Sequence, residues 1–182
     1  MPKYFRFALA LVFLLLLSTS ASAKIGTADI FSSTSPGDHK LALGLRYHQA
    51  ADSVAHRALS DEDLSWVLAY EYHEEIAFWQ IALGYASESN TDADARVLTP
   101  EVNLIFKDGI YRLGLGALIN RVSASKSQWT DLHWQVILGV SIPVASRISV
   151  DLYGHYLFHK WDEISKTSDN AAEASLLLAF QF

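Results

Sequence analysis

The chain has 182 residues, enough for one domain, and it contains no cysteine. The lack of cysteine excludes disulfide bonds, cysteine-ligated zinc sites and thiol nucleophiles. Fourteen Lys and Arg residues stand against twenty Asp and Glu residues, a formal net charge of −6, and so acidic a chain is a poor nucleic-acid binder. We therefore expect a single domain without covalent cross-links that does not bind nucleic acid.

The first 23 residues have the composition of a secretory signal peptide. Lys3 and Arg6 form a basic start, an apolar run follows, and small residues end the segment at Ala23. The apolar run is too short to span a membrane as a helix. Cleavage after Ala23 would leave a mature chain that starts at Lys24 with twelve basic and twenty acidic side chains, a net charge of −8.

Residues 24–40 are polar and rich in Ser, Gly and Pro, which predicts a periplasmic lead-in. Residues 41–182 then alternate between apolar side chains and small or polar ones, the pattern of β-strands with one apolar face. No apolar run in this part approaches the roughly 20 residues that a membrane helix needs. The alternating segments are 41–48, 65–73, 78–85, 98–106, 111–120, 132–141, 148–159 and 174–182.

The two faces of these segments differ in charge. One face carries no charged residue, and the other holds every charged side chain of the eight segments, namely Arg46, Glu71, Glu101, Arg112 and Asp151. A soluble β-sandwich would show the reverse, with charges outside and apolar side chains inside. The pattern therefore favours strands whose outer face meets lipid.

The connections between the segments alternate in length. Those after the second, fourth and sixth segments are tight, at 73–75, 107–109 and 143–147. The others are long and polar, at 51–63, 87–96, 123–131 and 160–173. Short turns at one end and long loops at the other are typical of outer-membrane barrels. Pro100 lies within the fourth segment and is the main local objection, because it lacks a backbone donor.

Aromatic residues lie near both ends of the segments, where the two membrane interfaces would be. The last segment ends on Phe182 and resembles the closing strand of bacterial outer-membrane barrels. We therefore predict an all-β protein, a single antiparallel eight-stranded transmembrane up-and-down β-barrel in the outer membrane of a Gram-negative-type bacterium. Its expected partners are outer-membrane lipid, lipopolysaccharide and, through the strand of Phe182, the barrel-assembly machinery.

The interior of an eight-stranded barrel is just wide enough for its own side chains. The inward charged residues are therefore interpreted as a pairing network that plugs the barrel, with a narrow solute pore as an alternative. Five histidines on the inward face could suggest a metal site, but their scatter has no ligand spacing; they are His48, His73, His133, His155 and His159. No phosphate loop or nucleotide motif occurs, so no cofactor is expected.

The carboxy-terminal half resembles the outer-membrane lipid A 3-O-deacylases, a family of esterases. The resemblance runs from the Thr-Pro-Glu that ends at Glu101, through Gly114-Leu115-Gly116, to Gly154-His155-Tyr156 and Glu173. The family's catalytic triad is Ser-His-Glu, with His and Ser in a His-x-Ser motif. The resemblance implies His155 as the base and Glu173 as its acidic partner.

The serine position of that motif is Leu157, which cannot attack an ester. The family's triad also opens toward lipid, whereas unbroken alternation points His155 inward, unless a bulge at Gly154 reverses it. Ser127, Ser149 and Ser175 are candidate substitute nucleophiles. Two functions remain open beside the pore: a structural or surface-interaction role without catalysis, and an esterase that acts on lipid A.

Overall fold

The computed structural model describes residues 37–49, 64–87, 96–123, 127–164 and 171–182. The predicted signal peptide and residues 24–36 of the predicted lead-in lie outside these ranges. The described elements are β1 (His39–Gln49), β2 (Leu64–His73), β3 (Ala77–Ala86), β4 (Arg96–Asp108), β5 (Tyr111–Leu118), β6 (Arg121–Ser123), β7 (Ser127–Trp129), β8 (His133–Ala145), β9 (Ile148–Phe158), the 3₁₀ helix η1 (Trp161–Glu163) and β10 (Ala171–Gln181).

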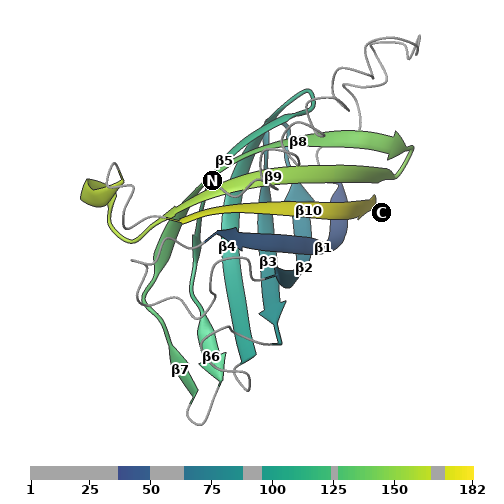
Figure 1. Ribbon diagram of the computed structural model, residues 1–182. Coiled ribbons are helices and arrows are strands. Elements are labelled where there is room, and N and C mark those ends of the chain that lie inside the picture. The colour runs from purple at the N-terminus through teal and green to yellow at the C-terminus, as the bar shows by residue number, and fades with distance from the viewer. Residues whose placement is uncertain (1–36, 50–63, 88–95, 124–126, 165–170) are drawn as a thin grey trace, which may run out of the picture. The chain divides into compact units, whose positions relative to one another are not determined.

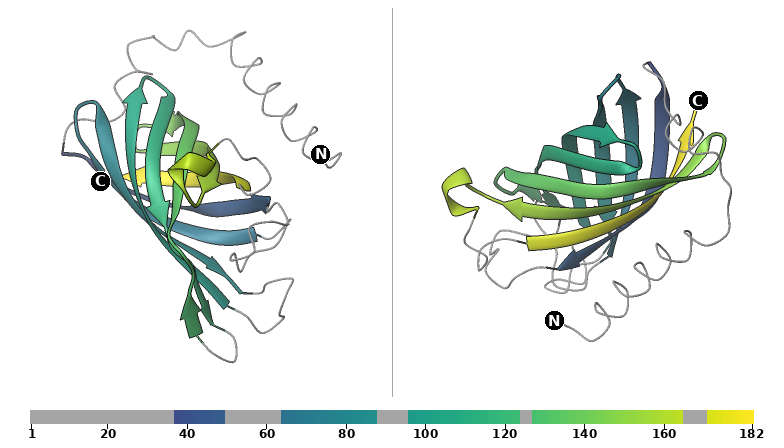
Figure 2. Two further views of the ribbon diagram at one scale, coloured as in Figure 1. Left: turned by 90° about the vertical axis from the view of Figure 1, so that its left-hand side faces the viewer. Right: turned by 90° about the horizontal axis from the view of Figure 1, so that it is seen from above.

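The strands form one closed antiparallel sheet (Figures 1 and 2). Consecutive strands pair from β1 to β5 and from β8 to β10, β6 pairs with β7, and β1 pairs with β10, which closes the ring. β4 pairs first with β6 and then with β5, so β5 and β6 together occupy one strand position in the barrel. β7 pairs with β6 and β8 pairs with β5, so β7 and β8 together occupy the next position. The ten strands thus occupy eight strand positions around the barrel, and the predicted eight-stranded antiparallel barrel is confirmed.

The barrel has two different ends. Tight connections join β2 to β3, β4 to β5 and β8 to β9 at one end, which also holds Phe182 and is called the turn end below. Gly109 takes a φ of 55° in the second of these turns, a conformation that favours glycine. The opposite end, where β1 ends and β2 begins, is called the loop end. The predicted tight turns are confirmed, whereas most of the predicted long loops lie outside the described residues.

The predicted alternation of the two faces is confirmed. In β2 every second residue is buried and the others are exposed, and β3 repeats this pattern almost without exception. In the last strand, Leu176 and Leu178 are exposed on the outer face while Leu177 is buried inside. Within the described strands, charged residues on the outer face occur only at strand ends: Arg96, Asp108 and Arg121.

Pro100 explains an interruption that the sequence pattern did not predict. The fifth segment was expected to run through residues 111–120, but the structure divides it into β5 and β6. The break at Ile119 lies opposite Pro100 of β4, which cannot donate a ladder hydrogen bond. The Pro100 carbonyl still accepts from the Ile119 amide at 3.2 Å. β4 therefore stays continuous while its partner is interrupted.

Further boundaries differ from the predictions, among them the start of β10 at Ala171. β8 extends to Ala145 through a register irregularity at Pro143, so the predicted turn shortens to two residues. β7 lies inside a predicted loop, and with β6 it projects beyond the neighbouring strands (Figure 1). β1 starts at His39, within the predicted lead-in, which places Lys40 inside the barrel. Each difference arises because pairing with a neighbour extends a strand beyond its alternating part.

The end of β9 also corrects two predicted orientations. His159 was predicted to face inward, but it follows the last residue of β9 and is exposed. Phe158 was predicted to face lipid, but it is only 1% exposed. Trp161 of η1 covers it, with the two rings packed edge-on and their centroids 4.9 Å apart. Among the described residues, no helix is long and apolar enough to cross a membrane.

Candidate functional site in the barrel interior

The interior of the barrel is lined by buried polar side chains from most of the strands. Apolar residues share this space, with Phe78, Ile105 and Ile137 almost completely buried. The buried polar and charged side chains are Lys40, Arg46, His48, Ser65, Glu71, His73, Gln80, Thr99, Glu101, Asn103, Arg112, Asn120, His133, Gln135, Ser141, Ser149, Asp151, His155, Glu173 and Ser175. Such groups need partners inside the protein, because water does not solvate them there.

Arg46 connects two carboxylates in the part of the interior nearer the loop end. Its Nη2 lies 2.9 Å from Oε1 of Glu101, and its Nη1 lies 3.8 Å from Oε2 of Glu173. Glu101 also accepts a hydrogen bond of 2.9 Å from the side-chain amide of Gln135. All four side chains are buried, so the guanidinium and both carboxylates depend on one another for charge compensation.

A chain of side-chain hydrogen bonds continues from this ion pair toward the turn end. The Gln135 amide donates to Asn103 at 2.6 Å, and Asn103 donates to Gln80 at 2.9 Å. Gln80 then donates to Oε1 of Glu71 at 2.9 Å. The other oxygen of Glu71 lies 2.9 Å from Nε2 of His73. The last two amide contacts join residues that lie opposite one another on adjacent strands, so this part of the chain follows the inner wall from β4 through β3 to β2.

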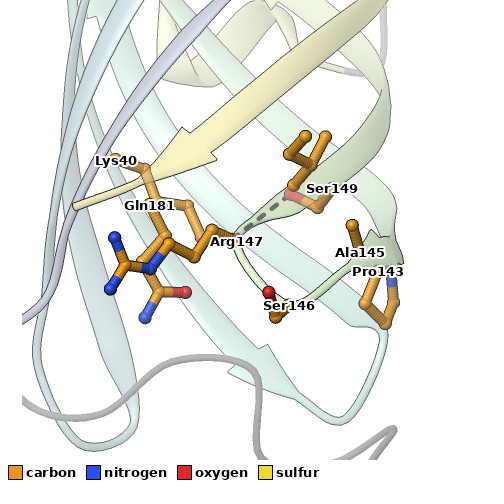
Figure 3. Close-up of a pocket in the computed structure, with 8 residues that line it drawn as sticks. Lys40, Pro143, Ala145, Ser146, Arg147, Ser149 and Gln181 are labelled. Carbon is orange, nitrogen blue, oxygen red and sulfur yellow. Dashed lines mark hydrogen bonds between the residues drawn. The ribbon is translucent and has the colours of Figure 1, made fainter.

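The turn end of the interior holds Lys40, whose Nζ donates to the hydroxyl of Ser149 at 3.3 Å. Figure 3 shows a small hollow beside this contact, where the β8–β9 turn meets β1 and β10. Its lining includes Ser146, Arg147 and Gln181. The Gln181 side chain is held by a hydrogen bond of 2.8 Å to Asp38.

The five inward charges predicted from the sequence are confirmed: each of them is at most 4% exposed. The sequence pattern missed Lys40 and Glu173, which are also buried. Lys40 was assigned to the lead-in and Glu173 to a loop, because the apolar alternation fades at both positions. The only available signal for an inward orientation was spacing: Lys40 lies two residues before the inward Ala42, and Glu173 lies two residues before the inward Ser175.

The two predicted catalytic residues lie directly opposite one another in the β9–β10 register. His155 points inward: its Nδ1 lies 3.0 Å from Oε1 of Gln135 and its Nε2 lies 2.8 Å from the hydroxyl of Ser175. Pairing continues through Gly154 without a bulge. Leu157 faces inward as well and is 1% exposed.

The three serines named as substitute nucleophiles have different surroundings. Ser175 contacts His155, whereas Ser149 contacts Lys40. Ser127 lies on the exposed β6–β7 hairpin and accepts from Nε of Arg121 at 3.1 Å. Among these three, Ser175 is the one that has a histidine ring in hydrogen-bonding distance in the described structure.

A second histidine makes a contact set that the sequence did not reveal. Nδ1 of His48 lies 2.8 Å from Oε1 of Glu173, and Nε2 lies 2.8 Å from the hydroxyl of Ser65. The three residues come from the consecutive strands β2, β1 and β10. No short motif connects them, because His48 and Glu173 are 125 positions apart.

The interior histidines do not converge on a common point in the described structure. His48, His73 and His155 each contact a different set of partners. No group of three His, Asp or Glu side chains in the described ranges is arranged to hold a metal ion. Stacking of His73 on Phe78, at 4.4 Å between ring centroids, is a packing contact.

Comparison with known proteins concerns the fold. The sequence matches no protein-family model, and no curated protein sequence matches it. The structure is similar to Neisserial surface protein A, with a TM-score of 0.51 and 13% identity over 80% of this chain and 96% of that one. The chain is a small eight-stranded β-barrel. Ail, the attachment invasion locus protein of Yersinia pestis, is similar with a TM-score of 0.50 and 15% identity, over 80% and 99% of the two chains.

Proposed function

We propose that this small barrel is an integral outer-membrane protein with a closed polar interior and a structural or surface-interaction role. The observation that carries the proposal is the distribution of side chains between the two faces of the sheet. In the middle of the strands, outward residues are apolar and many of them are exposed, whereas charged residues are buried. Water favours the opposite arrangement, and lipid favours this one.

The middle of the outer surface illustrates the argument. Leu43 lies beside Leu68 on one neighbouring strand and beside Leu178 on the other, and the three side chains are 54%, 47% and 57% exposed. An apolar belt of this kind is unusual on a soluble monomer. A closed barrel also leaves no unpaired backbone edge, which a lipid environment requires.

Aromatic side chains mark both edges of this belt. Near the turn end, the exposed aromatic residues are Tyr72, Trp79, Phe106, Tyr111 and Phe182. Near the loop end they are Trp66, Tyr85, Trp129 and Trp161. Rings with an apolar body and a polar edge favour the boundary between lipid and water. The two girdles support a transmembrane orientation in which the strands cross the bilayer.

The contacts between interior side chains support a closed barrel in preference to a solute pore. The Arg46–Glu101 ion pair connects β1 with β4 across the interior, and the amides of Gln135, Asn103 and Gln80 extend this network to β8 and β3. Moving a solute past them would break several buried hydrogen bonds. The names of two proteins with a similar structure refer to a surface protein and to attachment, and a surface role for this chain is part of the proposal.

A charge placed in the apolar belt tests the membrane part of the proposal. We expect Leu43→Arg to lower the free energy of unfolding from lipid vesicles by about 2–4 kcal/mol, because the guanidinium would lie near the middle of the bilayer. Val144→Arg is the matched control: Val144 is 58% exposed on the outer face at the turn end, where the cost is about 0–1 kcal/mol. Equal effects at both positions would contradict a lipid-facing belt.

Electrical recordings test the closed interior. We expect the folded wild-type protein in a planar lipid bilayer to give no reproducible conductance steps, because the proposed closed interior leaves no continuous path for ions. The alternative of a narrow solute pore predicts defined conductance steps, which should disappear when larger side chains are placed in the interior. Such steps in the wild-type protein would overturn the closed-interior proposal and leave the membrane location intact.

A further inference from the structure

Ser65, His48 and Glu173 form a constellation at the loop end of the interior. Glu173 Oε1 and Ser65 Oγ lie on opposite sides of the His48 ring, each 2.8 Å from a ring nitrogen. The exposed fractions of the three residues are 3%, 2% and 4%. The carboxylate contacts Nδ1 and the hydroxyl contacts Nε2, which is the order of contacts in a serine-hydrolase triad.

We propose that Ser65 is a nucleophile that His48 and Glu173 activate, and that it reacts with short carboxylic esters entering from the loop end. A neutral His48 with its proton on Nδ1 satisfies both contacts, since it donates to Glu173 and accepts from the Ser65 hydroxyl. The activity does not require transport through the barrel. The constellation lies at the loop end, and the hydrogen-bond network of Gln135, Asn103 and Gln80 lies on its turn-end side.

The reaction follows from these contacts. Ser65 Oγ attacks the carbonyl carbon of the ester while its proton passes to Nε2 of His48. The tetrahedral intermediate collapses, the alcohol leaves with the proton from His48, and the acyl group stays on Ser65 as an ester. A water molecule then attacks this ester and loses its proton to His48. The carboxylic acid leaves, and the proton returns to Ser65.

Arg46 completes the surroundings of the constellation. It lies opposite Ser65 in the β1–β2 register, and its Nη1 lies 3.8 Å from Oε2 of Glu173. Its Nε is buried and makes no hydrogen bond within the described part of the chain. A buried donor without a partner carries a free-energy penalty. The positive charge beside Ser65 suits the negative charge that develops on the attacked carbonyl oxygen.

The chain contains a matched internal control. Ser175 and His155 make the same contact between a hydroxyl and Nε2, also at 2.8 Å, but the group at Nδ1 of His155 is the neutral amide of Gln135. An amide stabilises the imidazolium that forms during proton transfer less than a carboxylate does. Ser65 is therefore expected to react, and Ser175 is expected to react much more slowly.

Covalent labelling tests the proposal. The full-length protein, folded in detergent micelles, is treated with diisopropyl fluorophosphate, and the modified residue is located by peptide mass spectrometry. We expect the label on Ser65, loss of labelling in Ser65→Ala and retention in Ser175→Ala. His48→Gln should slow labelling by about 10²- to 10⁴-fold, because the general base is lost.

The position of the label on the wild-type protein tests the proposal even if a variant fails to fold, because that measurement needs no substitution. A label on Ser175 or on another serine, or no label on the folded wild-type protein, would overturn the proposal. Hydrolysis of p-nitrophenyl acetate in the same samples gives an independent readout and should fall with the Ser65 label. None of these outcomes bears on the membrane location.

Discussion

At the scale of single residues, the most consequential contact is the pair of Arg46 and Glu101. Both side chains are buried in the barrel interior, where separating opposite charges is costly. The carboxylate of Glu101 also accepts from Gln135, so its removal leaves both a cation and an amide without this partner. The pair holds strands β1 and β4 in position across the interior, since neither group can move without the other.

We predict that Glu101→Leu lowers the free energy of unfolding by about 3–5 kcal/mol, because it leaves the Arg46 guanidinium buried with less compensation. The measurement is urea unfolding of the protein from lipid vesicles. Combining it with Arg46→Met removes both charges, and this double variant should recover most of the lost stability. Glu75→Leu, on an exposed turn, should change stability by less than about 0.5 kcal/mol. A double variant no more stable than Glu101→Leu would contradict this account.

At the scale of elements, the seam between β1 and β10 closes the barrel. Their register runs without interruption from Lys40 opposite Gln181 to Gln49 opposite Ala172. Gly44 lies within this seam, and a Cβ there would collide with the backbone of Leu176 and Leu177. Glycine at this position therefore allows the two strands to approach one another closely.

We predict that Gly44→Ala lowers the free energy of unfolding by about 1–3 kcal/mol, as expected for a side chain that has no space. Gly154→Ala is the matched control, because a Cβ there would meet nothing closer than the Leu138 carbonyl at 3.8 Å. Guanidinium unfolding of the two variants in the same detergent compares them directly. Equal midpoints would show that the seam relaxes to accept a methyl group.

At the scale of the whole molecule, Phe182 lies where the ring of strands closes. Its backbone amide donates to the carbonyl of His39 at 3.0 Å. Its ring stacks on the His39 ring, with 5.9 Å between the ring centroids. The Phe182 residue is nevertheless 61% exposed at the turn end. Its contribution to packing is therefore small, which leaves the ring accessible to another protein.

We predict that Phe182→Ala changes the free energy of unfolding of the purified barrel by no more than about 1 kcal/mol. In cells, the same change should reduce the amount of folded protein in the outer membrane, because we propose that the assembly machinery binds the terminal strand. Phe106→Ala is the control, since Phe106 is 48% exposed at the same end of the barrel. Equal amounts of both variants in the membrane would argue against a special role for the terminal ring.

The sequence predicted most of the fold because strand alternation is a local property. A period of two assigns each residue to one face regardless of its partners, and the positions of Arg46, Glu71 and Asp151 in the interior follow from it. The same argument failed where local pattern and pairing disagree. His159 continues the alternation of β9, yet the strand ends before it.

The candidate site was only partly predictable. The sequence singled out Glu173 through a family resemblance and paired it with His155, which lies opposite it in the register. The hydrogen bond of Glu173 to His48, and that of His48 to Ser65, depend on the closure of β10 onto β1. A sequence pattern contains no information on which residues meet across that seam until the register is known.

The sequence by itself determined the class of fold, the number of strand positions in the barrel and the identity of most side chains that line the interior. Each of these follows from period-two patterning and connection length. Only the tertiary structure decided which of those side chains contact one another. The physical reason is that closing the ring brings together the first and last strands of the barrel, and the register of β1 with β10 selects the contact between His48 and Glu173.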